Sequence, residues 1–214
     1  MKLFYGADTF FKIPTYGKGN PGNDYGLGFY LTKEKNLAEL WAKKNKNGGY
    51  VLTFDVDVSS FKTLELDTSD ELSILRWITL LVKYRFSYTD RVLYKDVIDW
   101  LISHFDVPIN DYDFIIGYRA DDSYFSYSRG FVNGDISIET LSNALKLGKL
   151  GKQYVLISKK AFNNIKYVKH YEVHNDDEYE LFRQKTLNEY HELLNKEDRF
   201  VNHFIGDLMK KYGK

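Results

Sequence analysis

The chain has 214 residues, which is enough to form one domain with a complete hydrophobic core. It contains no cysteine, which excludes disulfides and thiolate metal sites and leads us to expect a cytoplasmic protein. The 30 basic residues equal the 30 acidic residues, so we expect no dominant, sequence-independent binding of nucleic acid. No apolar run has the length of a membrane span, and we expect no membrane partner.

The first part of the chain predicts short strands and one helix around a long loop. Glycine and proline residues mark the loop over 7–23, and apolar residues alternate with polar ones in the strand that follows the helix. Thr32 is placed to cap the helix at its N-terminus. The predicted elements are strands at Lys2–Gly6 and 28–32, a helix at Lys33–Lys44 and a strand at Tyr50–Val58.

The rest of the chain predicts a helical insertion over 68–106, further strands and helices, and a helical tail over 176–212. The insertion opens at 68–71 with the spacing of a capping box. The tail either completes the core or serves a partner. We therefore predict a single α+β domain over 1–214. The predicted elements are helices at 70–82, Thr89–Phe105, 122–130 and 137–147, and strands at Asp113–Tyr118, Gln153–Ser158 and Ile165–His174.

Three formal motifs in the chain are candidates for binding sites. The glycines over 17–22 match the dinucleotide fingerprint, but no crossover unit surrounds them and a proline lies inside, so we reject the match. Asp55 and Asp57 fall on one face of a predicted strand and either hold a cation or form its solvated side. His170 and His174 share a strand face with no third ligand nearby, so we predict no metal site.

The stretch from Asp24 to Trp41 is the most informative part of the sequence. Gly28 permits a close approach of the backbone that a side chain would prevent. Tyr30 lies on a short strand and Trp41 on the following helix, so that their rings are placed to face each other across a slot. A flat cationic ring such as nicotinamide would stack there with about 0.5–2 kcal/mol of cation–π attraction. The alternative is that both rings belong to the core.

Taken together, these segments resemble the ADP-ribosyltransferase fold of the diphtheria-toxin type. The resemblance implies a split, mixed and antiparallel β-sheet core with helical insertions and a C-terminal helical extension. More narrowly, the chain is similar to an uncharacterised bacterial family of ADP-ribosyltransferase-like proteins, through residues 16–30, 118–125 and 150–153. The segments that match the superfamily in order are Leu3-Phe4-Tyr5-Gly6, Gly28-Phe29-Tyr30-Leu31-Thr32, Trp41 eleven residues after Tyr30, Tyr50-Val51-Leu52-Thr53-Phe54 and Lys152-Gln153-Tyr154-Val155.

The resemblance implies a binding site for NAD as the substrate. Tyr30 and Trp41 would hold the nicotinamide ring between them, and the backbone of Gly6 would bind its amide. Thr32 would contact the nicotinamide-side ribose. Tyr5 stands where the family usually has histidine and would give one hydrogen bond to a ribose hydroxyl.

Gln153 stands where the family has its catalytic glutamate. Cleavage of the nicotinamide–ribose bond builds positive charge on the ribose, as glycoside cleavage does. Glutamine keeps the hydrogen bond of glutamate but loses its charge, which costs roughly tenfold in rate. Loss of preorganised charge in a dry site costs more, on the order of a hundred- to a thousandfold. The site is therefore slowed and not necessarily inactive.

Other charged residues have two open interpretations. Asp121 or Asp122 would supply the missing carboxylate to the cleft, unless both simply stabilise a helix N-terminus. An acidic acceptor would be another source of that charge. Arg119 either grips the phosphates of NAD or forms a structural ion pair.

The leading hypothesis from the sequence is a mono-ADP-ribosyltransferase. Such an enzyme cleaves NAD, releases nicotinamide and transfers ADP-ribose to a protein or nucleic acid with inversion at the ribose carbon. By resemblance we expect a toxin-like role and a neutralising antitoxin protein as partner. The alternatives are a weakened or inactive module that binds NAD or ADP-ribose, and an NAD glycohydrolase with water as the acceptor.

Overall fold

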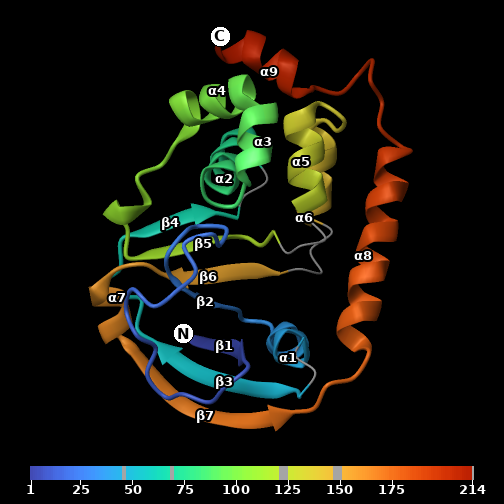
Figure 1. The fold of residues 1–214 in the computed structure, drawn as a ribbon. Helices are drawn as coiled ribbons and strands as arrows, with labels where there is room; N and C mark the ends of the chain where they lie inside the picture. Colours follow the sequence, from blue (N-terminus) through green and yellow to red (C-terminus); the bar gives the residue numbers. More distant parts are fainter. Residues whose placement is uncertain (45–46, 68–69, 121–124, 147–150, 214) are drawn as a thin grey trace.

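The computed structural model describes residues 1–44, 47–67, 70–120, 125–146 and 151–213, and the described chain is a mixed α+β structure with two sheets (Figure 1). The first sheet is antiparallel, with the strand order β1-β3-β7. Its strands are β1 (Lys2–Ala7), β3 (Gly49–Val56) and β7 (Ile165–Val173). Alternation along β3 places Leu52 and Phe54 toward the second sheet, whereas Val51 packs under the first helix.

The second sheet is mixed and has the strand order β2-β6-β5-β4. Its one parallel pair is β4 with β5, and the other neighbours are antiparallel. Its strands are β2 (Phe29–Leu31), β4 (Thr63–Leu66), β5 (Phe114–Tyr118) and β6 (Lys152–Leu156). An apolar cluster that includes Phe54 and Leu156 fills the space between the two sheets. The larger core, which includes Trp77 and Phe131, lies between the second sheet and a helical layer.

Helices cover the outer faces of both sheets. Helix α1 (Lys35–Lys43) packs on the first sheet through Ala38 and Ala42. The short α7 (Lys159–Asn163) joins β6 to β7, and α8 (Glu178–Leu194) packs on α1 and α6. The helical layer on the second sheet contains α2 (Glu71–Tyr84), α3 (Tyr88–Leu93), α4 (Lys95–Phe105), the 3-10 turn η1 (Ile109–Asp111), α5 (Phe125–Asn133), α6 (Ile138–Lys146) and α9 (Ile205–Tyr212).

Most predicted elements are present, but some boundaries were wrong. Helix α1 begins at Lys35 after the N-cap residue Glu34, and the Thr32 hydroxyl accepts a hydrogen bond from the Glu34 N–H instead of capping the helix directly. The helix predicted at Thr89–Phe105 is two helices: the first begins after a capping box of Ser87 with Asp90 and ends at Leu93, and the backbone of Tyr94 leaves the helical conformation before the second begins at Lys95.

Two further predictions fail at the ends of strands. β3 ends at Val56, and the Asp57 carboxylate accepts hydrogen bonds from Ser59, so Asp57 is not a strand neighbour of Asp55. β6 ends at Leu156 because Ser158 caps α7, accepting from the Ala161 N–H at 3.1 Å. Strand β4 and helix α7 were not predicted.

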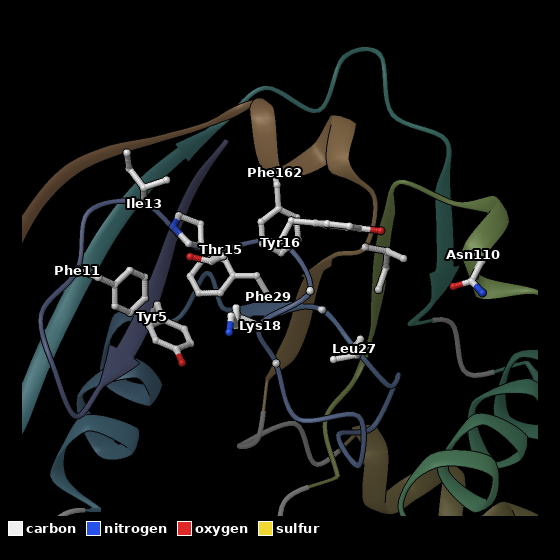
Figure 2. A pocket seen from close by; sticks show the side chains of 15 residues that line it. Tyr5, Phe11, Ile13, Thr15, Tyr16, Lys18, Leu27, Phe29, Asn110 and Phe162 are labelled. Atoms are coloured by element: carbon white, nitrogen blue, oxygen red, sulfur yellow. The ribbon is translucent and has the colours of Figure 1, made fainter.

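The loop between β1 and β2 folds back over the first sheet through its aromatic side chains (Figure 2). The ring centroid of Phe11 lies 5.6 Å from that of Tyr5 and 6.0 Å from that of Phe29. Tyr16 meets Phe162 of α7 edge to face at 5.5 Å. A segment that is rich in glycine and proline is therefore anchored by ring packing at both ends.

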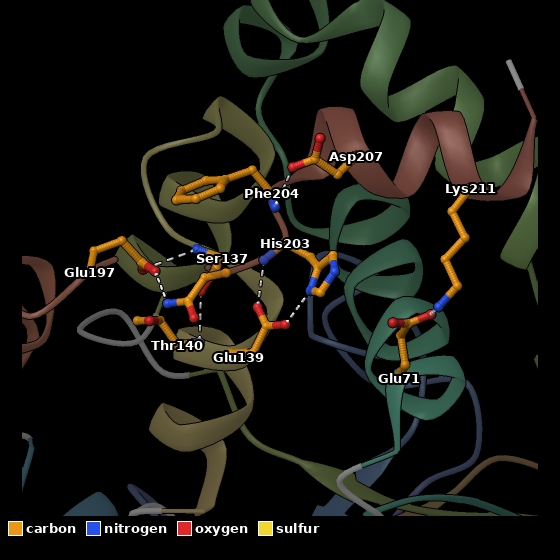
Figure 3. A network of polar contacts seen from close by, with 10 residues as sticks. Glu71, Ser137, Glu139, Thr140, Glu197, His203, Phe204, Asp207 and Lys211 are labelled. Carbon is orange, nitrogen blue, oxygen red and sulfur yellow. Dashed lines mark hydrogen bonds and ion pairs between the residues drawn. The ribbon is translucent and has the colours of Figure 1, made fainter. Parts of the chain in front are cut away.

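The C-terminal tail completes the core, because α9 packs on α4 and α5 and buries Ile205 and Leu208. A network of polar contacts fixes the turn before α9 (Figure 3). The Glu139 carboxylate of α6 accepts from the His203 N–H at 2.9 Å and pairs with His203 Nδ1 at 2.7 Å. None of the described helices has both the length and the apolar character needed to cross a membrane.

The His203–Glu139 contact predicts a pH-dependent part of the stability. The hydrogen bond to Glu139, with smaller effects of Asp207 and Glu71, raises the pKa of His203. Protonated His203 therefore stabilises the folded state below its ordinary pKa, and this contribution is lost as pH rises through the raised pKa. We expect His203→Gln to lower the melting temperature more at about pH 5.5 than at about pH 8.5. His174→Gln, at an exposed histidine, is the control, and equal effects of His203→Gln at both pH values would contradict the assignment.

Candidate functional site

A cavity of about 400 Å³ lies where elements of both sheets meet α1 and α8. It brings together five side chains that the sequence singled out, although the chain separates them by up to 148 positions, from residue 5 to residue 153. These are Tyr5 of β1, Tyr30 of β2, Trp41 of α1, Arg119 after β5 and Gln153 of β6. Tyr179 of α8 also lines the cavity, so the tail contributes to its wall.

The remaining predicted residues are placed differently. Gly28 packs against β6, where a Cβ atom would lie 2.6 Å from a methyl carbon of Val155. Thr32 is fully buried beside the start of α1. Neither residue lines the cavity, nor does Gly6. Asp121 and Asp122 lie outside the described residues, and among those that are described no group of three or more His, Asp or Glu side chains is placed to hold a metal ion.

Gly6 turns its backbone N–H and C=O groups away from β3. Phe4 exchanges backbone hydrogen bonds of 2.7 and 2.9 Å with Thr32, and the direction of these groups alternates along an antiparallel strand. The N–H and C=O of Gly6 therefore point away from β3, to the same side as those of Phe4. A Cβ atom on Gly6 would lie 2.2 Å from the carbonyl oxygen of Ala38, so the glycine also allows α1 to pack closely.

Tyr30 is held rigidly by the loop that precedes its own strand. Its hydroxyl accepts from the Tyr25 N–H at 3.0 Å and donates to the Gly26 carbonyl at 2.6 Å. Burial raises the pKa of this hydroxyl, so it remains protonated and able to donate. The ring of Tyr30 stacks on that of Tyr25, with centroids 6.5 Å apart and planes inclined by 16°.

Tyr25 fastens this loop to the helical layer. Its hydroxyl donates to the Tyr118 carbonyl at 2.6 Å, and the same carbonyl accepts from Trp77 Nε1 at 3.0 Å. Gly117 makes room for the contact, since a Cβ atom there would lie 2.1 Å from the Tyr25 hydroxyl. The segment from Asp24 to Tyr30 is thus positioned by hydrogen bonds from two directions.

Asp24 is the functional candidate that sequence reasoning missed. Its side chain is only 5% exposed and forms a 2.7 Å ion pair with Arg85, which follows α2. Its other oxygen accepts from the Ala120 N–H at 2.9 Å and from Gln153 Nε2 at 3.1 Å. Burial raises the pKa of the Asp24 carboxyl, while Arg85 and the Ala120 N–H oppose the shift. A carboxylate therefore adjoins Gln153, and it comes from position 24, which the sequence analysis did not single out.

Gln153 has one polar atom with no hydrogen bond inside the described protein. The residue is 7% exposed, and its Nε2 group donates to Asp24. Its Oε1 atom is buried without a hydrogen-bond partner among the described residues. An orphaned buried acceptor costs about 1–3 kcal/mol, and because Gln153 lines the cavity, a ligand hydroxyl that reached Oε1 would satisfy it.

Trp41 already carries a planar cation on its ring. The guanidinium carbon of Arg119 lies 3.9 Å from the ring centroid. This contact demonstrates the cation–π capacity of the exposed indole face. It also gives Arg119 a packing partner at the wall of the cavity.

A second cavity, of about 510 Å³, adjoins the first and shares Tyr5 with it (Figure 2). The loop between β1 and β2 forms one wall, with Phe11, Tyr16 and Lys18, and Phe162 of α7 forms another. Its lining is mainly aromatic and aliphatic, whereas the first cavity is lined largely by polar and charged side chains.

The sequence profile of the DUF3990 family, described as a protein of unknown function, matches residues 1–167, about three quarters of the chain. The chain therefore belongs to the DUF3990 family. No curated protein and no solved structure matches it. The family match includes the cavity residues from Tyr5 to Gln153 and ends within β7, so that α8 with Tyr179 lies beyond it.

Proposed function

We propose that this protein is a mono-ADP-ribosyltransferase that uses NAD and has an ADP-ribosyltransferase-like fold. The observation that carries the proposal is the meeting of Tyr30, Trp41 and Gln153 in one cavity. These residues match the two stacking aromatics and the catalytic position of that superfamily, and no local sequence pattern brings them together. The antiparallel sheet beside a mixed sheet, with helices on the outer faces, is compatible with the same fold.

The residues present fit NAD at both of its ends. The nicotinamide ring takes the place of the Arg119 guanidinium over Trp41, with Tyr30 as the second aromatic wall. The displaced guanidinium of Arg119 then forms an ion pair with the phosphates of NAD. The nicotinamide ring thus gains a stacking contact with Trp41, and the phosphates gain a positive charge. The resemblance assigns the nicotinamide amide to the backbone of Gly6, which follows the cavity residue Tyr5 in the chain but does not itself line the cavity. The adjoining aromatic cavity takes the adenine ring, and Tyr5 stands between the two compartments.

In the reaction, the bond between the nicotinamide nitrogen and the ribose anomeric carbon breaks, and its electron pair stays on nicotinamide. A nucleophile of the acceptor forms the new bond to that carbon from the opposite face and loses its proton. Gln153 Oε1 accepts a hydrogen bond from a ribose hydroxyl and orients the sugar. The nearby Asp24 carboxylate faces the positive charge that develops on the ribose.

The acceptor is a macromolecule, protein or nucleic acid, and a toxin-like activity restrained by a neutralising antitoxin protein is consistent with this chemistry. The experiment that tests the function measures nicotinamide release from NAD by the purified protein, with and without cell lysate. We expect release that depends on lysate and that falls about tenfold or more in Gln153→Ala and in Tyr30→Ala. Gln184→Ala and Tyr88→Ala, at exposed positions, are matched controls that should leave release unchanged.

Two other outcomes are distinguished by the same assay, and the glutamine at position 153 together with Tyr5 favours the first of them. A binding module would bind NAD without releasing nicotinamide, and Tyr30→Ala would abolish that binding. An NAD glycohydrolase would release nicotinamide without lysate and would leave no ADP-ribose on a macromolecule. Either result would overturn the transferase proposal.

A further inference from the structure

The Gln153 side chain has two different ends, and only one of them serves the reaction proposed above. An amide offers an acceptor oxygen at one end and a donor NH2 group at the other. A ribose hydroxyl that is to gain electron density must donate its proton, and therefore needs the oxygen end. A carboxylate has two equivalent acceptor oxygens and needs no such choice. Where glutamate is replaced by glutamine, some other group must fix which end faces the substrate.

Asp24 is placed to fix the orientation of the Gln153 amide. Its Oδ2 atom lies 3.1 Å from Gln153 Nε2, and an ionised carboxylate has no proton to give, so it accepts only from the NH2 end. Arg85 at 2.7 Å and the Ala120 N–H at 2.9 Å both donate to Asp24 and favour its ionised, acceptor-only form against the effect of burial, which raises the pKa of the carboxyl. The opposite end of the amide, Oε1, is the buried atom without a hydrogen-bond partner in the described protein.

We propose that Asp24 is a positioning residue that locks the Gln153 amide with its oxygen toward the substrate ribose. The inference rests on the proposed transferase function. Asp24 and Gln153 together then replace a single glutamate: Gln153 supplies the contact to the ribose hydroxyl, and Asp24 supplies the orientation and the negative charge behind it. Arg85 keeps Asp24 in place from the side away from Gln153.

The test is a cycle of four proteins: the wild type, Asp24→Asn, Gln153→Glu and the double variant. The maximal rate of nicotinamide release and the Kd for NAD are measured for each. In the protein that retains Gln153, we expect Asp24→Asn to lower the maximal rate of nicotinamide release about tenfold or more and to change the Kd for NAD less. The reason is that the asparagine NH2 group favours the flipped Gln153 amide, in which the NH2 group and not the oxygen faces the ribose. In the Gln153→Glu background, the same substitution should have little effect or raise the rate, since it removes a like charge next to a side chain that needs no orientation.

A purely structural role of Asp24 gives a different pattern. Asp24→Asn would then reduce the rate by the same factor in both backgrounds, and the inference would be wrong while the transferase proposal stands. A wild type that releases no nicotinamide under any condition overturns both. The melting temperatures of all four proteins are compared, so that loss of folded protein is not counted as loss of rate.

A measurement on the wild type covers the case in which Asp24→Asn does not fold. The side-chain amide protons of Gln153 are identified by NMR as the pair of signals lost in Gln153→Ala. We expect these protons to exchange slowly with solvent, because they donate to a buried carboxylate. Exchange as fast as that of the exposed Gln184 would contradict the proposed orientation.

Discussion

Replacing Arg85 with methionine is expected to lower the free energy of unfolding by about 3–5 kcal/mol. The Asp24 side chain is 5% exposed and that of Arg85 17%, and their atoms approach to 2.7 Å. Removal of the guanidinium leaves a carboxylate buried with two neutral donors and only the weaker effect of the Arg119 charge. A similar-sized apolar side chain at position 85 fills space but does not solvate that charge. The measurement is chemical denaturation followed by circular dichroism.

The control for this prediction is Arg183→Met, which breaks an arginine–carboxylate pair of 3.4 Å whose side chains are 42% and 58% exposed. An exposed pair contributes about 0–1 kcal/mol, so the control should change the stability little. Combining Asp24→Asn with Arg85→Met removes the buried charge as well as its partner. The double variant should therefore recover part of the free energy of unfolding that Arg85→Met alone loses. An Arg85→Met protein as stable as the control would show that Asp24 is neutral or solvated, and would weaken its assigned role beside Gln153.

The sequence predicted those parts of the fold that depend on local patterns. The strand with Tyr30 and the helix with Trp41 follow from alternation and helical spacing over about a dozen residues. The capping box at Ser87 and Asp90 was also a local signal, and it marks the start of α3 at Tyr88; the break at Tyr94, between α3 and α4, has no comparable local signal. Strand β4 shows a two-residue alternation, with Leu64 and Leu66 buried and Glu65 exposed, but its length of four residues made it easy to miss.

The part of the site that the sequence did not predict depends on distant partners. Asp24 bonds to Arg85 over 61 positions and to Gln153 over 129 positions. Neither separation leaves a periodic signature, because the pairing arises only when β6 and the turn after α2 meet the same loop. The carboxylate was sought at positions 121 and 122 since these follow a buried strand. The end of that strand does bind a carboxylate, because the Ala120 N–H donates to Asp24, while Asp121 and Asp122 lie outside the described residues and stay a prediction.

Trp41→Ala is expected to weaken NAD binding by about 10- to 100-fold, as loss of one aromatic stacking partner costs about 1–3 kcal/mol. Of the three tryptophans, all of which the structure describes, Trp41 is the one that lines the cavity; Trp77 and Trp100 are buried and donate to backbone carbonyls. Nicotinamide-dependent quenching of tryptophan fluorescence should therefore report on Trp41 and vanish in Trp41→Ala. The Kd of each variant is measured by calorimetry, so that the result does not depend on turnover.

Trp41→Phe separates stacking from a general loss of packing. Phenylalanine keeps a flat face for the nicotinamide ring, so we expect most of the affinity to remain, with a loss of about tenfold or less. Arg119→Met adds a second comparison, because Arg119 covers the indole face in the structure and must leave it when nicotinamide stacks. If Arg119 also pairs with the phosphates, its removal weakens the binding of NAD more than the binding of nicotinamide alone. Wild-type affinity for NAD in Trp41→Ala would place the nicotinamide ring elsewhere, and the slot between Tyr30 and Trp41 would then be part of the packing and not of the site.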